Sequence, residues 1–166
     1  MGFFSSIFGS RGNPKPATGQ PVDTAAGKAD GEAFLDALLP FAEQMLREHR
    51  EFFPFGGSMK PDGEIIHEGA HTGSEHPPSQ ELIDLLRQAH QKAAAERQIR
   101  ACAIVYDIRT VPPGRSQKQD AIALAVDHCG GYSAVVIFPY SFGADGELAI
   151  EAPFAVQGDR AIFPAF

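Results

Sequence analysis

The residues of this chain that could most directly do chemistry are His67-Glu68-Gly69-Ala70-His71, which match the pattern H-E-x-x-H. On a helix this spacing places two imidazoles on one face to bind zinc and leaves the glutamate as a general base. His76 follows shortly afterwards and could supply a third imidazole. One hypothesis is therefore a zinc-dependent hydrolase with ligands His67, His71 and His76 and with Glu68 as the base.

The surrounding sequence favours a β-hairpin over a helix. Lys60-Pro61-Asp62-Gly63 is a turn pattern, and apolar runs at residues 52–55 and 64–67 flank it. Gly69 and Gly73 would each cost a helix about 1 kcal/mol. In a strand, residues i and i+4 lie about 13 Å apart, too far for two Zn–N bonds of about 2.1 Å. We therefore expect solvated histidines, no metal or cofactor and no catalytic residue, with the zinc site as the alternative.

A second group with chemical potential is Asp127-His128-Cys129, an acid, an imidazole and a thiol in succession. A nucleophilic thiol needs its imidazole within hydrogen-bond reach. Neighbouring residues on a strand point to opposite faces, so His128 and Cys129 are not expected to pair. The chain has two cysteines and no C-x-x-C, and a bond between Cys102 and Cys129 stays open. Free thiols in a reducing cytoplasm are the expectation.

The composition of the chain indicates one soluble globular domain. It has 166 residues, of which 43% are hydrophobic and 21% are charged. The net charge of −7 speaks against a nucleic-acid binder, which usually has a basic face. The loop at residues 112–119, near Arg109, Arg115 and Lys118, is the only locally basic region and lacks the spacing of a phosphate cradle. We therefore expect a cytoplasmic protein with no nucleic-acid partner.

The first part of the chain differs from the rest. Residues 11–28 are rich in Gly, Pro, Ala and Thr, which predicts a flexible tail over residues 1–29 and one domain over residues 30–166. The tail starts with a short apolar cluster that could touch a membrane surface weakly. Its members are Phe3, Phe4, Ile7 and Phe8. Met1-Gly2 followed by Ser6 also fits a myristoylation pattern.

Two helices are predicted. The first runs from an N-cap at Asp30 to about His49, with a kink or break at Pro40. Its expected buried face contains Phe34, Leu38, Phe41 and Met45. The second helix begins with Ser79 as N-cap. Its inward residues are expected to be Leu82, Leu86, Ala89 and Ala93, with His90 at the boundary.

The remainder of the chain predicts β-strands. These cover residues 101–111, 121–129, 132–140, 148–155 and a short last strand at 160–163. In the second of them, apolar residues alternate with Ala123, Ala125 and Asp127, which predicts a strand covered well on one face. Because Ala121, Ala123 and Ala125 are small, we expect that face to be thinly covered and to serve as a docking or dimer surface.

The order helix, hairpin, helix and then strands indicates an α+β domain with one antiparallel sheet of about five or six strands. This succession (α-ββ-α-βββ) resembles the profilin or roadblock arrangement, in which a sheet carries helices on a face. The resemblance concerns topology and implies no activity.

Three short segments, Phe53-Pro54-Phe55-Gly56, Pro61-Asp62-Gly63-Glu64 and Ile162-Phe163-Pro164, resemble a pattern in small bacterial proteins that have no known activity. The resemblance spans about residues 50–166 and implies no reaction. We therefore predict a non-catalytic bacterial domain that binds another protein or itself, with a regulatory or immunity-type role. The alternative is the zinc-dependent hydrolase.

Overall fold

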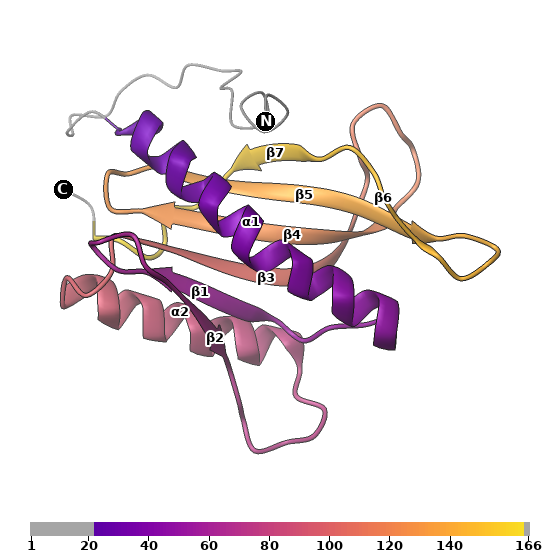
Figure 1. The fold of residues 1–166 in the computed structure, drawn as a ribbon, viewed down its shortest axis with the longest axis horizontal. Coiled ribbons are helices and arrows are strands. Elements are labelled where there is room, and N and C mark those ends of the chain that lie inside the picture. Colours follow the sequence, from indigo (N-terminus) through magenta and orange to yellow (C-terminus); the bar gives the residue numbers. More distant parts are fainter. Residues whose placement is uncertain (1–21, 165–166) are drawn as a thin grey trace.

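The computed structural model describes residues 22–164, and within them the element order is α-ββ-α-βββββ (Figure 1). The helices are α1 (Thr24–His49) and α2 (Ser79–Ala95). The strands are β1 (Phe55–Met59), β2 (Ile65–Gly69), β3 (Ala101–Thr110), β4 (Gln119–His128), β5 (Ser133–Phe142), β6 (Leu148–Ile150) and β7 (Phe154–Gln157). The sheet runs β2-β1-β3-β4-β5, and both β6 and β7 pair with β5. Every pairing is antiparallel, which confirms the α+β class and the antiparallel sheet.

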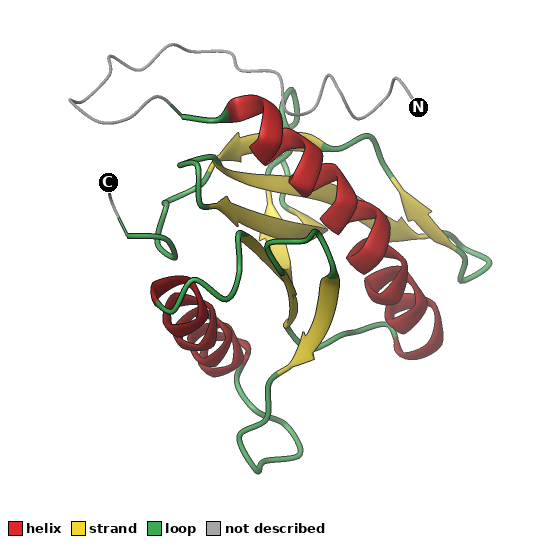
Figure 2. Cartoon of the chain, turned by 60° about the vertical axis from the view of Figure 1, so that its left-hand side comes forward, coloured by secondary structure: helices red, strands yellow, loops and turns green. Residues whose placement is uncertain are grey.

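The two helices cover opposite faces of the sheet (Figure 2). In β3, Ala103 and Val105 belong to the core under α1, whereas Cys102 and Ile104 pack in the smaller clusters that also contain residues of α2. Because side chains alternate along a strand, one central strand serves both layers. The two helices therefore pack on the sheet from opposite sides.

Helix α1 begins earlier than the sequence predicted. Asp23 is its N-cap and accepts a hydrogen bond from the backbone N–H of Ala26 (3.1 Å). The prediction of Asp30 as N-cap is wrong, since Asp30 lies inside α1 and is buried. The predicted boundary between residues 1–29 and 30–166 thus falls within a helix. The predicted apolar cluster of the tail lies outside the described residues.

The core beneath α1 is apolar at its centre. Phe34 and Leu38 are completely buried, and Ala42 and Leu46 continue the same stripe. Phe41 does not belong to it, because its side chain is 43% exposed. α1 is not broken at Pro40. This proline lies on the exposed side of the helix, where water can hydrate the carbonyl that loses its partner.

Strand β4 shows the predicted alternation, because Ile122, Leu124 and Val126 lie in the core beneath α1. The opposite face of β4 is better covered than expected. Ala121 and Ala123 are completely buried; the register places Ala123 between Tyr106 of β3 and Ile137 of β5. Larger neighbours thus shield the small side chains, and the prediction of a thinly covered alanine surface is wrong for these two residues.

The last part of the chain is less regular than predicted. The single strand expected at residues 148–155 is two short strands, β6 and β7, separated by a segment that contains Pro153, which has no N–H to donate. Residues 160–163 form no strand. Arg160 has a left-handed backbone (φ 54°), and the N–H of Ala161 bonds to the side chain of Asp159 (3.2 Å). This local turn replaces strand pairing.

Over the described part of the chain, neither helix has the length and apolar character needed to cross a bilayer.

Candidate functional site

The H-E-x-x-H pattern lies in and just beyond strand β2, as the hairpin prediction required. The turn before β2 closes through a bond from the N–H of Lys60 to the carbonyl of Glu64 (2.9 Å), with Gly63 at φ 94°. His67 and Glu68 therefore point to opposite faces of the sheet. His71 and His76 lie in the following loop and are exposed. Among residues 22–164, no three His, Cys, Asp or Glu side chains are grouped so as to hold a metal ion.

Glu68 is held by two partners on the α2 face. It accepts a hydrogen bond from the hydroxyl of Ser58 on β1 (2.6 Å). Its other carboxylate oxygen lies 2.5 Å from Nε2 of His90 on α2. Partial burial alone would raise the pKa of Glu68, but the bonds to His90 and Ser58 outweigh it, and the net effect lowers the pKa. The pair therefore ties the edge strand to α2.

His90 lies deeper in the protein than the sequence predicted. It is 1% exposed and not a boundary residue. The buried stripe of α2 runs through Leu82, Leu86, His90 and Ala94, while Ala89 is exposed. The i+4 spacing of Leu82, Leu86 and Ala94 was the signal that could have identified His90. Its Nδ1 is the one buried side-chain nitrogen or oxygen in the described residues without a hydrogen-bond partner.

Polar side chains continue from Ser58 across the sheet in a single row, which we call the polar row. Ser58 is opposite Cys102, Cys102 is opposite Asp127, and Asp127 is opposite Ser133. Burial raises the pKa of the Cys102 thiol well above its usual value, and the charges of Asp127 and Glu68 raise it further. Cys102 is therefore a protonated thiol and a poor nucleophile.

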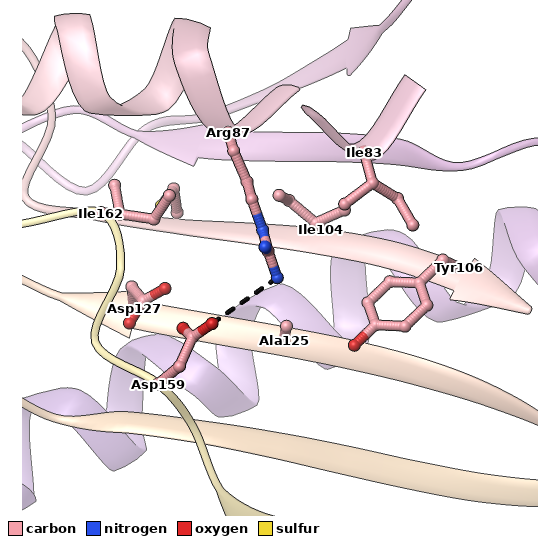
Figure 3. A pocket seen from close by; sticks show the side chains of 9 residues that line it. Ile83, Arg87, Ile104, Tyr106, Ala125, Asp127, Asp159 and Ile162 are labelled. Carbon is pink, nitrogen blue, oxygen red and sulfur yellow. Dashed lines mark ion pairs between the residues drawn. The ribbon is translucent and has the colours of Figure 1, made fainter. Parts of the chain in front are cut away.

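Asp127 is 9% exposed. Burial raises its pKa, and the hydrogen bond with Ser133 offsets only part of this effect. A small pocket beside Asp127 opens between α2, β3, β4 and residues 159–162 (Figure 3). Its volume is about 20 Å³, enough for about one water molecule. As Figure 3 shows, Arg87 reaches over it toward Asp159, with 3.7 Å between Nη2 and Oδ2. A substrate-sized molecule does not fit in this space.

The segment after β7 covers one end of the polar row. Ile162 is 5% exposed and packs with Cys102, Ala94 and Ile99. The carbonyl of Ala161 accepts a bond from Gln91 of α2 (2.9 Å). Residues 158–163 therefore act as a cover between α2 and the sheet.

The Asp127-His128-Cys129 group is divided between the two faces, as the alternation predicted. His128 faces α1, and its Nε2 lies 3.1 Å from Asp30. Its Nδ1 accepts the backbone N–H of Gly130 (2.9 Å), so neither nitrogen is available as a base for Cys129. Arg100 makes two further bonds to Asp30 (3.0 and 2.8 Å). This cluster fastens α1 to β3 and β4, and both Cys102 and Cys129 are free thiols.

Two of the three basic side chains near the loop at residues 112–119, those of Arg109 and Arg115, are engaged with carboxylates. Arg109 lies 3.4 Å from Asp120, and Arg115 lies 2.9 Å from Glu151. These are exposed ion pairs of small energetic value.

The outer edge of β2 differs from these clusters, in which side chains are hydrogen-bonded or ion-paired with one another. In the part of the chain that the structure describes, β2 is a terminal strand of the sheet and pairs only with β1. Lys60 and Glu64 form a hydrogen-bonded pair at the end of the hairpin. Hydrogen-bonded and non-hydrogen-bonded pairs alternate along an antiparallel ladder, so the backbone groups of Ile66 and Glu68 point toward β1. The N–H and C=O groups of Ile65, His67 and Gly69 then point to the open edge.

Next to this edge lies a groove between His71-Thr72 and α2. Its volume is about 410 Å³, and it is lined by Glu81, Asp84, Leu85 and Gln88 of α2 together with the two loop residues. It is open to solvent. Leu85 supplies an apolar side chain that is 40% exposed.

No family model, curated protein or solved structure matches this chain. The resemblance of the segments at residues 53–56, 61–64 and 162–164 to small bacterial proteins therefore stays a prediction.

Proposed function

We propose that this domain is a non-catalytic protein-binding module that takes up an extended segment along the outer edge of β2. A free strand edge presents unpaired backbone donors and acceptors, and peptide segments commonly bind by completing them. In β2 these groups belong to Ile65, His67 and Gly69. The binding role predicted from the sequence thus moves from the alanine surface, where Ala121 and Ala123 are buried, to the edge of the sheet.

The observation that carries the proposal is the gathering of exposed apolar side chains around this edge. Four of the large apolar residues that are exposed in residues 22–164 lie near β2. They are Phe41, Phe53, Ile66 and Leu85. Exposed apolar groups that cluster at one place are typical of interaction sites.

The positions of three of these residues follow from their contacts or their strand, and that of Phe53 follows from its place in the sequence. The ring of Phe41 packs edge-on against Phe55 at 4.9 Å, and Phe55 is the cross-strand neighbour of Gly69. Phe53 precedes Phe55 by two residues. Ile66 is on β2 itself, and Leu85 lines the groove beyond its end. An added strand would therefore meet apolar side chains on both faces.

The polar groups of the α2 face support a binding role over catalysis. The hydroxyl of Ser58 donates to Glu68, and His90 contacts the same carboxylate. A nucleophilic hydroxyl needs a base strong enough to take its proton, and the lowered pKa of Glu68 makes its carboxylate a weak one. Here the carboxylate stands between the hydroxyl and the imidazole, an arrangement suited to holding β2 in place.

A test can use peptides selected from a random seven-residue library displayed on phage, with the full chain as bait. Selected peptides should lose at least about tenfold in affinity for His67→Pro, which removes an outward N–H without breaking a bond to β1. His67→Ala is the matched control, because it removes the imidazole and keeps the N–H. Peptides that bind His67→Pro as well as the unmodified protein, or a selection that yields none, would overturn the proposal.

A further inference from the structure

We infer that the strand completing the edge of β2 is β2 of a second copy of this chain, paired antiparallel about a two-fold axis at His67. This inference rests on the proposed function, since it names the occupant of the same edge. A two-fold contact uses the same patch on both copies, so the patch must be complementary to itself. The sequence of β2 meets that requirement in one register only.

In the register centred on His67, all five residues of β2 are paired. His67 faces His67 of the other copy, Ile65 faces Gly69, and Ile66 faces Glu68. The bonded pairs would be formed by Ile65, His67 and Gly69, the residues whose backbone groups point outward. At each end of the contact, Ile65 of one copy thus lies opposite Gly69 of the other.

Gly69 leaves room for this arrangement. A Cβ placed on Gly69 would meet no atom within 4 Å. On the α1 face, Gly69 lies beside Phe55 of β1. Ile65 of the second copy, opposite Gly69, would therefore extend the row toward Phe55 and the adjoining ring of Phe41. Cross-strand contacts between aromatic and β-branched side chains are among the favourable ones.

Like charges exclude the neighbouring registers. An axis at Ile66 would place Glu64 opposite Glu68 of the other copy. An axis at Glu68 would place the two Glu68 residues opposite each other. Like charges directly opposite in a sheet are destabilising, whereas the axis at His67 leaves each Glu68 beside Ile66 and bound to Ser58 and His90. Charge and size thus select the same register.

The test is sedimentation equilibrium of the full chain at neutral pH over a range of concentrations. The unmodified protein should associate to a dimer. His67→Glu and His67→Lys should each weaken the dimer at least about tenfold, because each places like charges together at the axis. An equal mixture of these two variants should regain dimers, because opposite charges then meet. Restored association also shows that both variants are folded.

His76→Glu and His76→Lys are the matched controls, since His76 is exposed in the loop away from the axis; both should dimerise like the unmodified protein. A chain that stays monomeric at every concentration would overturn the inference. A dimer that His67→Glu leaves intact, or a mixture that regains nothing, would also do so. Peptide binding that depends on the N–H of His67 would in each case preserve the proposed function and show that only the occupant was wrong.

Discussion

The two faces of the sheet are buried by different means, although β3 supplies alternate residues to both. Beneath α1 the centre of the core is apolar, with Phe34, Leu38 and Leu124 completely buried. Beneath α2 the same strands present the polar row, and α2 adds His90 to it. On the α1 side the charged Asp30 lies in the second turn of the helix, before the apolar stripe that starts at Phe34.

This difference separates two tasks. Apolar burial is proportional to area and has no direction, so the α1 face is expected to supply most of the stability. Hydrogen bonds need defined geometry, so the α2 face is expected to fix the position of β2 relative to α2. The edge that we propose for binding is held in place by the second kind of contact.

The largest effect is expected from Leu38→Ala on the α1 face. Leu38 is completely buried, and such truncations cost about 2–5 kcal/mol because a cavity remains. The free energy of unfolding from urea titration measures it. Phe41→Ala, at a side chain that is 43% exposed, should cost far less. Equal losses at both positions would contradict the assignment of the α1 core.

A smaller loss in the free energy of unfolding is expected from His90→Leu on the α2 face. It removes the partner of Glu68, and a partly buried group without its bond costs about 1–3 kcal/mol. Adding Glu68→Leu should recover part of this loss, because replacing both partners by apolar groups is nearly neutral. A double-mutant cycle in urea measures the coupling. Strictly additive losses would mean that the contact between His90 and Glu68 contributes nothing.

The polar row should also give the protein a pH dependence that Asp127→Asn reduces. The pKa of Asp127 is raised above 3.8 by burial. A raised carboxyl pKa means that the folded state holds its proton more tightly than the unfolded state. The stability contribution of Asp127 therefore falls as the pH rises from 3.8 through the folded pKa.

The measurement is the free energy of unfolding against pH for both proteins. Because Asp127→Asn lacks this titrating proton, its free energy of unfolding should fall less as the pH rises through the folded pKa of Asp127. Glu68, whose pKa is lowered, acts in the opposite sense, since its contribution is present above the unfolded pKa and is lost as the pH falls through the folded one. Parallel curves for Asp127→Asn and the unmodified chain would show that Asp127 is solvated.

The smallest effect is expected from the paired substitution His67→Ala and His71→Ala. Both side chains are exposed, and changes at such positions usually stay within about 0.5 kcal/mol. Zinc content, measured by mass spectrometry on freshly purified protein, should be the same in the variant and the unmodified chain. About one zinc per chain that disappears in the variant would restore the hydrolase hypothesis.

Local patterns in the sequence predicted much of the fold. The turn at residues 60–63 and the alternation in β4 depend on neighbouring residues only, and both are confirmed. The start of α1 was predicted wrongly because Asp30 and Asp23 are equally good N-caps by type. Asp30 is instead a buried partner of Arg100, which is 70 positions away in the sequence. Nothing local distinguishes these two roles.

The candidate site was harder to predict than the fold, because its members come from different elements. Glu68 was singled out for its neighbours in the sequence, whereas its actual partners are Ser58 and His90. The polar row depends on the register of four strands, and register is set by pairings that one strand does not reveal. The open edge of β2 likewise follows only from the order of strands.

The cover formed by residues 158–163 has a consequence for how the protein is made. These residues are translated after the seven strands of the described part of the chain, yet Ile162 completes the cluster around Cys102. Domains tend to fold as their chain emerges, and incomplete folds expose apolar surface. The layer under α1 can form first, since its helix and its core strands are already present. The thiol of Cys102 therefore lacks the cover of Ile162 until residues 158–163 have been synthesised and have packed against α2.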